Sequence, residues 1–279
     1  MTQRVDKEFG DLLSDSWDEY KKNFKIYFNV FLLLVVIPSL VLFVYQAPHT
    51  YNLLTQNIES FQDILDIFGT KYMIIMNVLW IITLALAMFM SISLIYNSIY
   101  KKNKMSVEQT LKGGKKYFWR YIFFSLVYLI FIIGLSLLLI IPGLIFIVYW
   151  LFAPYILIKE NKGIIASLKS SYCLVKGRWW KTFWTLLLFA LVLILILIIF
   201  SVVSAILNVL IMIPFVFSAV SKNGFEILLT KGFFTNLPFS AFLLTNLVSK
   251  IFELGQTLII APLSILFFKN LYLEYLRKR

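Results

Sequence analysis

The stretch TFWTLLLFALVLILILIIFSVVSA, residues 182–205, decides the fold class. It contains no charged side chain, and it is longer than the roughly 20 apolar residues that an α-helix needs to cross a bilayer. Apolar runs in buried helices of soluble proteins are shorter, at about 10–14 residues. We therefore expect a transmembrane helix at this position.

The composition of the whole chain supports the same fold class. Of the 279 residues, 61% are hydrophobic and only 14% are charged, against roughly 25% charged in soluble domains. The chain has a single cysteine, Cys173, and a single histidine, His49. An intrachain disulfide and a Cys/His zinc site are excluded, because each needs several such residues. We expect an all-α integral membrane protein with no cofactor and no nucleic-acid partner.

Apolar runs predict six transmembrane helices. They lie at about residues 26–45, 72–96, 121–141, 143–158, 182–205 and 251–268. Only Pro142 and Gly143 separate the third from the fourth, which predicts a structural turn and a tight hairpin, because proline ends a helix and glycine tolerates positive φ. The fourth run is short for a span, so a re-entrant hairpin is the alternative. Three prolines inside spans are expected to kink them: Pro38, Pro154 and Pro262.

Two further stretches, residues 46–71 and 206–250, are predicted to lie on the outer side of the membrane. Residues 51–68 repeat apolar side chains every three or four positions, which predicts an outer amphipathic helix. In the second stretch, Asn208 and Pro214 predict a break after the fifth span. The residues that follow this break are expected to lie along the membrane interface.

The basic residues predict the orientation in the membrane. The formal net charge is +12, and Lys and Arg gather on one side of the predicted bilayer, with the exceptions of Lys71, Lys222, Lys231 and Lys250. Because basic loops remain in the cytoplasm, both termini are predicted to be cytoplasmic. We expect a multi-pass protein of a prokaryotic plasma membrane.

Each cytoplasmic stretch before an odd-numbered span has the same pattern: an amphipathic segment, a basic and aromatic cluster, then the span. The pattern predicts three repeats, each an interfacial helix followed by a transmembrane hairpin. Residues 1–25 form the first interfacial segment, with Leu12 and Tyr20 on its apolar face. In the second segment, Gly113 and Gly114 are expected to end the interfacial helix.

The basic and aromatic clusters are candidate sites for lipid or a partner, since Trp suits headgroup depth and Lys and Arg reach anionic phosphates. The candidates are Lys21 and Lys22 in the first cluster, Lys115, Lys116, Trp119 and Arg120 in the second, and Lys176, Arg178, Trp179, Trp180 and Lys181 in the third. The alternative is that the clusters only anchor helix ends. Convergence of the second and third clusters on the hairpin would favour a specific lipid or partner site.

Ionisable residues at membrane depth are costly, and they mark functional sites by default. Lys250 and Glu253 form such a pair, three residues apart on one helix face, with Gln256 one turn further. An interfacial salt bridge is the first interpretation. The second is a polar cavity in which these residues join Asn77, Ser204, Asn208 and Asn246. The third is binding of a lipid headgroup by Lys250.

The run IPGLIFIVYWLFAPYIL, residues 141–157, followed by LVKGRWW, residues 174–180, carries a family resemblance. Residues 141–184 resemble the membrane domain attached to some glycerophosphoryl diester phosphodiesterases, and stand-alone YciC-like integral membrane proteins. The resemblance implies a helical membrane domain. The catalytic barrel of the phosphodiesterases is a separate soluble domain, and no stretch outside the predicted membrane is long enough for it. The phosphodiesterase activity is therefore not carried over to this chain.

The sequence predicts a non-enzymatic multi-pass membrane protein that contacts anionic lipid at the inner leaflet, together with a membrane protein partner or a second copy of itself. A transporter or channel subunit with a polar path near Glu253 is the alternative. An intramembrane lipid-modifying enzyme is a remote third, because common catalytic motifs are missing. A lateral groove near Arg178 would favour lipid or partner contact, and a continuous polar tunnel past Glu253 would favour transport.

Overall fold

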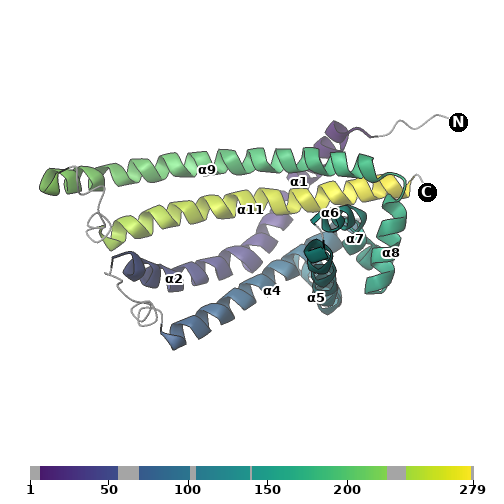
Figure 1. The fold of residues 1–279 in the computed structure, drawn as a ribbon, viewed down its shortest axis with the longest axis horizontal. Coiled ribbons are helices and arrows are strands. Elements are labelled where there is room, and N and C mark those ends of the chain that lie inside the picture. The colour runs from purple at the N-terminus through teal and green to yellow at the C-terminus, as the bar shows by residue number, and fades with distance from the viewer. Residues whose placement is uncertain (1–6, 56–68, 101–104, 139, 225–236, 278–279) are drawn as a thin grey trace. The chain divides into compact units, whose positions relative to one another are not determined.

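The computed structural model describes residues 7–55, 69–100, 105–138, 140–224 and 237–277. Every regular element in these residues is a helix, which confirms the predicted all-α class (Figure 1). Six helical segments are long and apolar enough to cross a membrane, as predicted. They are Phe9–Thr55, Lys71–Tyr100, Val107–Leu137, Ile141–Lys159, Trp179–Lys222 and Phe239–Leu276.

The first segment is a continuous run of helix. It comprises α1 (Phe9–Phe31), a π-helical turn η1 (Leu32–Val36) and α2 (Ile37–Thr55). The π turn ends two residues before Pro38, which has no N–H to donate and so interrupts the regular α-helical pattern. α1 runs without interruption through residue 25, the predicted boundary between the interfacial segment and the first span. Most of the predicted outer amphipathic helix lies outside the described residues.

α4 (Thr70–Tyr100) and α5 (Val107–Leu138) approach each other closely at two glycines. Gly113 and Gly114 lie inside α5, so the predicted helix end at these residues is wrong. A Cβ atom at Gly114 would lie 2.9 Å from the Ser93 Cα of α4, and one at Gly113 would collide with the Tyr96 ring. The glycines therefore permit close helix packing, as small residues do in membrane proteins.

α6 (Ile140–Tyr149) packs against α5, which forms the predicted hairpin. Its turn is not at Pro142 and Gly143, however, because both residues lie in the first turn of α6. A proline there costs no hydrogen bond, since the first N–H groups of a helix have no partner within the helix. Gly143 lies against Ser136 of α5, where a Cβ atom would collide with the serine hydroxyl.

The predicted fourth span, residues 143–158, consists of two helices. α6 ends at Tyr149, and α7 (Ala153–Lys159) begins with Pro154 in its first turn. Ser171 of α8 (Ile164–Val175) compensates the break: its Oγ accepts from the Phe152 N–H at 3.2 Å and donates to the Tyr149 carbonyl oxygen at 2.7 Å. Phe152 is fully buried, so its backbone N–H needs such a partner within the protein.

The three stretches that precede odd-numbered spans differ from one another. α8 is a separate helix before α9 (Trp179–Asn223), whereas the corresponding residues of the first two stretches are continuous with α1 and α5. The three-fold repeat therefore stays a prediction.

α9 and α11 (Phe239–Leu276) are long helices. The 45 residues of α9 correspond to about 68 Å of helix. The predicted break at Asn208 or Pro214 is wrong, because α9 continues through both residues. A proline inside a membrane helix is tolerated where neighbouring groups or small backbone adjustments satisfy the freed carbonyl. Of the predicted outer segment, residues 206–223 belong to α9 and residues 239–250 belong to α11, while residues 225–236 lie outside the described residues.

The chain divides into two compact units. The first contains Met1–Leu34, Leu86–Leu193 and Leu258–Arg279, and the second contains Val35–Ala85 and Ile194–Thr257. Core residues of the first unit are Phe124, Ala153, Leu157 and Leu168. Core residues of the second are Leu42, Tyr72 and Met76.

Candidate functional site

The second basic and aromatic cluster lies on α5 in the first unit. Arg120 donates from Nη1 to the Asn161 Oδ1 at 2.6 Å, in the loop between α7 and α8. Lys115, Lys116 and Trp119 are exposed, and Trp119 keeps 68% of its surface accessible. One member of the cluster therefore connects two parts of the fold, while the others face outward.

The third cluster lies where α8 turns into α9. Gly177 makes this turn with a φ of 84°, a conformation that other residues rarely adopt. The Arg178 guanidinium carbon lies 5.4 Å from the centre of the Tyr275 ring of α11. The Trp179 indole donates from Nε1 to the Ile145 carbonyl oxygen of α6 at 3.2 Å. Arg178 and Trp179 thus tie the start of α9 to two other helices.

The remaining members of the third cluster are exposed. They are Lys176, Trp180 and Lys181, and Trp180 keeps 67% of its surface accessible. Trp179 contacts α6, and Arg120 contacts the loop after α7, so both clusters reach the segment that follows the hairpin turn. The second and third clusters thus each contain residues that connect parts of the fold and residues that are exposed.

The first cluster is organised differently. Lys21 forms a local ion pair with Asp18 at 2.9 Å, and Lys22 is exposed. On the predicted apolar face of α1, Leu12 and Tyr20 are buried. Trp17 is 40% exposed, while the polar Ser16 and Asn23 are buried instead. The buried face of α1 is therefore partly polar.

Beside this polar face lies an ion pair that the sequence did not predict. Lys269 of α11 pairs with Glu19 of α1, and the two side chains are 6% and 23% exposed. Beside it, the Asn270 amide donates to the Ser16 Oγ at 3.0 Å. In the sequence, Lys269 is one of the many basic residues predicted to lie on the cytoplasmic side. No local pattern connects two residues that lie 250 positions apart.

A groove of about 360 Å³ adjoins the third cluster. Lys181 and Tyr275 belong to its lining, and Arg178 stacks on the same tyrosine ring. The other lining residues come from the start of the chain, α9 and α11: Lys7, Glu8, Phe9, Leu12, Thr185, Leu271 and Glu274. The groove therefore carries charged groups of both signs near Arg178.

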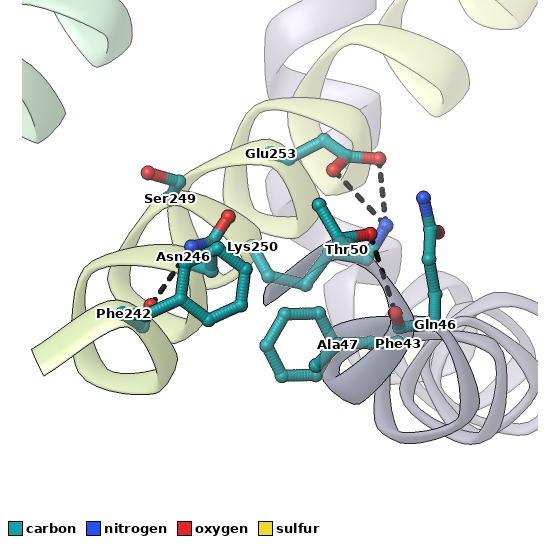
Figure 2. Close-up of a pocket in the computed structure, with 9 residues that line it drawn as sticks. All are labelled: Phe43, Gln46, Ala47, Thr50, Phe242, Asn246, Ser249, Lys250 and Glu253. Atoms are coloured by element: carbon teal, nitrogen blue, oxygen red, sulfur yellow. Dashed lines mark hydrogen bonds and ion pairs between the residues drawn. The ribbon is translucent and has the colours of Figure 1, made fainter. Parts of the chain in front are cut away.

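The predicted salt bridge between Lys250 and Glu253 is present in the second unit. The Lys250 ammonium donates to both carboxylate oxygens of Glu253, at 2.9 and 3.0 Å. The pair borders a polar hollow of about 220 Å³ between α2 and α11. Lys250 reaches from α11 toward the side chains of Gln46 and Thr50 on α2 (Figure 2). Asn246 and Ser249 also line this hollow.

Glu253 lines a second hollow as well, of about 280 Å³, between α9 and α11. The predicted cavity residues Gln256, Ser204 and Asn208 line it. Asn77 is placed elsewhere, on α4, where its amide donates to the Met73 carbonyl oxygen at 2.8 Å. The polar residues expected around Glu253 are thus divided between two hollows on either side of α11, and Asn77 lines neither of them.

In the described part of the chain, no group of three or more His, Cys, Asp or Glu residues could hold a metal ion. The fold and the apolar helices define the class of this protein as a multi-pass helical membrane protein. Comparison with known proteins finds no matching protein family, no matching curated protein and no matching solved structure. The resemblance to the phosphodiesterase membrane domain and YciC-like proteins therefore stays a prediction.

Proposed function

We propose that this protein is a non-enzymatic membrane protein that contacts anionic lipid at the cytoplasmic leaflet through its second and third clusters. One observation carries the proposal: Trp119 and Trp180 are both about two-thirds exposed beside exposed lysines. An indole ring costs little at headgroup depth, and a neighbouring ammonium can pair with a lipid phosphate.

Contacts inside the protein support the proposal. Arg120, Arg178 and Trp179 hold helices together, so they fix the positions from which Lys115, Lys176 and the exposed indoles project. A rigid frame lowers the entropic cost of binding a mobile headgroup. The groove that Lys181 lines offers a recess at the third cluster.

The proposal is tested by removing two exposed charges, with Lys115→Gln and Lys176→Gln in one protein. The matched control is Lys71→Gln with Lys222→Gln, which removes two exposed lysines from the predicted outer side. Native mass spectrometry then compares retention of phosphatidylglycerol with that of phosphatidylcholine. Each lysine near an anionic surface contributes about 1 kcal/mol, so the preference for phosphatidylglycerol should fall by about 30-fold. No lipid preference in the unmodified protein, or an equal fall in the control, would reject the proposal.

A further inference from the structure

An apolar groove of about 810 Å³ lies in the second unit, beside the hollows around Glu253. Its walls come from α2, α9 and α11, and its lining is largely apolar, with Leu54, Met212, Val216 and Phe242 among the lining residues. The volume falls within the range of about 300–1,000 Å³ that is usual for small-ligand sites. Such walls suit a hydrocarbon chain.

The groove is continuous in its lining with the polar hollow at Lys250. Thr50, Phe242 and Asn246 line both. Asn208 lines the groove and also the second hollow, where Glu253 is its neighbour in the lining. A molecule with an apolar tail and a polar head would therefore find both environments at one place.

The polar end contains charges of both signs. Lys250 and Glu253 pair with each other, and their side chains are 17% and 56% exposed. A simple anion would meet the carboxylate, and a simple cation would meet the ammonium. A headgroup that carries both a phosphate and an amine can satisfy both residues at once.

Asn208 supplies an independent observation that points to a donor in the ligand. Its amide nitrogen donates to the Ser249 Oγ at 2.8 Å. Its Oδ1 is buried and has no hydrogen-bond partner among the described residues. A buried acceptor without a partner is costly, and an N–H group from a ligand would remove that cost.

We propose that the second unit binds a zwitterionic phospholipid with a primary amine, of the phosphatidylethanolamine class. An acyl chain occupies the apolar groove, the phosphate pairs with Lys250, and the ammonium donates to Glu253 and to the Asn208 Oδ1. A trimethylammonium headgroup has no N–H and cannot make the last two contacts. The site is therefore selective for the amine headgroup over its methylated form.

The test uses the full chain purified in mild detergent, with native mass spectrometry of bound phosphatidylethanolamine, phosphatidylcholine and phosphatidylglycerol. Met212→Trp fills the groove. Its matched control is Leu210→Trp, at an exposed residue of the same helix that lines none of the hollows described above. Glu253→Gln keeps the shape of the side chain and removes its charge.

We expect the unmodified protein to retain phosphatidylethanolamine at least roughly tenfold more strongly than phosphatidylcholine, because the loss of even one of the two charge-assisted hydrogen bonds has about that effect. Met212→Trp should lower retention at least tenfold, and Leu210→Trp should leave it unchanged. Glu253→Gln should remove the preference for the amine headgroup. Equal retention of all three lipids, or an unchanged preference in Glu253→Gln, would overturn the proposal.

The lysine variant Lys115→Gln with Lys176→Gln separates this proposal from the proposed function. Loss of phosphatidylglycerol preference in that variant, with retention of phosphatidylethanolamine unchanged, is expected if two distinct sites exist. Loss of both preferences together would overturn the second site and assign all binding to the clusters. Phosphatidylethanolamine selectivity without any phosphatidylglycerol preference would reject the proposed function and leave this site standing.

Discussion

One ion pair of the first unit and one of the second differ in their burial and in whether they join two helices. In the first unit, Glu19 and Lys269 join two helices, and both side chains are largely buried. In the second, Lys250 and Glu253 lie on one helix, and the carboxylate is 56% exposed beside two hollows. A pair between helices stabilises their packing, whereas a local pair at a hollow can exchange partners with a ligand. Glu19 and Lys269 therefore hold two helices of the first unit together, whereas Lys250 and Glu253 leave a carboxylate accessible to a ligand.

The largest expected effect is the loss of the buried pair. Glu19→Gln leaves the Lys269 ammonium buried without its counter-charge, which should lower the free energy of unfolding by about 3–5 kcal/mol. Thermal unfolding of the purified protein in detergent measures the change. Asp18→Asn is the matched control, because Asp18 is next to Glu19 in the sequence and forms an exposed local pair with Lys21.

Replacing both partners sharpens the comparison. Glu19→Gln with Lys269→Met leaves no buried charge, so much of the lost stability should return. If Asp18→Asn destabilises the protein as much as Glu19→Gln, the buried pair has no special role in the first unit.

The next largest loss of stability is expected at Gly114 of the first unit, with Gly255 of the second unit as the comparison. Gly114→Ala places a Cβ atom 2.9 Å from the Ser93 backbone and should cost about 1–3 kcal/mol. Gly255→Ala in the second unit meets only the edge of the Phe200 ring at 3.0 Å, which can move aside, so its effect should be close to zero. Unfolding in detergent measures both.

Gly134 provides the control for these glycines, since a Cβ atom there meets nothing within 4 Å. Gly134→Ala should stabilise the protein by about 0.5–1 kcal/mol through the helix preference of alanine. Equal destabilisation by Gly114→Ala and Gly255→Ala would show that the two units are packed equally tightly.

The smallest effect is expected at the local pair of the second unit. Glu253→Gln removes an exposed ion pair between residues three apart, which contributes about 0.2–0.5 kcal/mol in helices. Its unfolding curve should nearly coincide with that of the unmodified protein, although its lipid preference changes. A loss of several kcal/mol would instead make this pair structural, like Glu19 and Lys269.

Local sequence patterns predicted the features that are determined by residues close together in the sequence. The six apolar segments follow from runs of hydrophobic side chains, and the pair of Lys250 with Glu253 follows from their spacing on one helix. The pair of Glu19 with Lys269 depends on which helices become neighbours, and hydropathy contains no such information.

The wrong predictions of helix ends share one cause. Glycine and proline, which often end helices in soluble proteins, have other roles between packed apolar helices. Gly113 and Gly114 permit close packing against α4 instead of ending a helix. Pro142 lies in the first turn of α6, where its missing N–H has no consequence. Pro214 interrupts one hydrogen bond inside α9 without ending the helix. Local composition cannot distinguish these uses, because the neighbouring helix decides between them.

The partnership of Glu19 with Lys269 also has a consequence for biosynthesis. Their 250-position separation corresponds to about 12–50 s of translation, at roughly 5–20 residues per second. Throughout that interval the nascent chain carries a carboxylate whose counter-ion has not yet been made. Completion of the first unit is thus a late event that waits for α11.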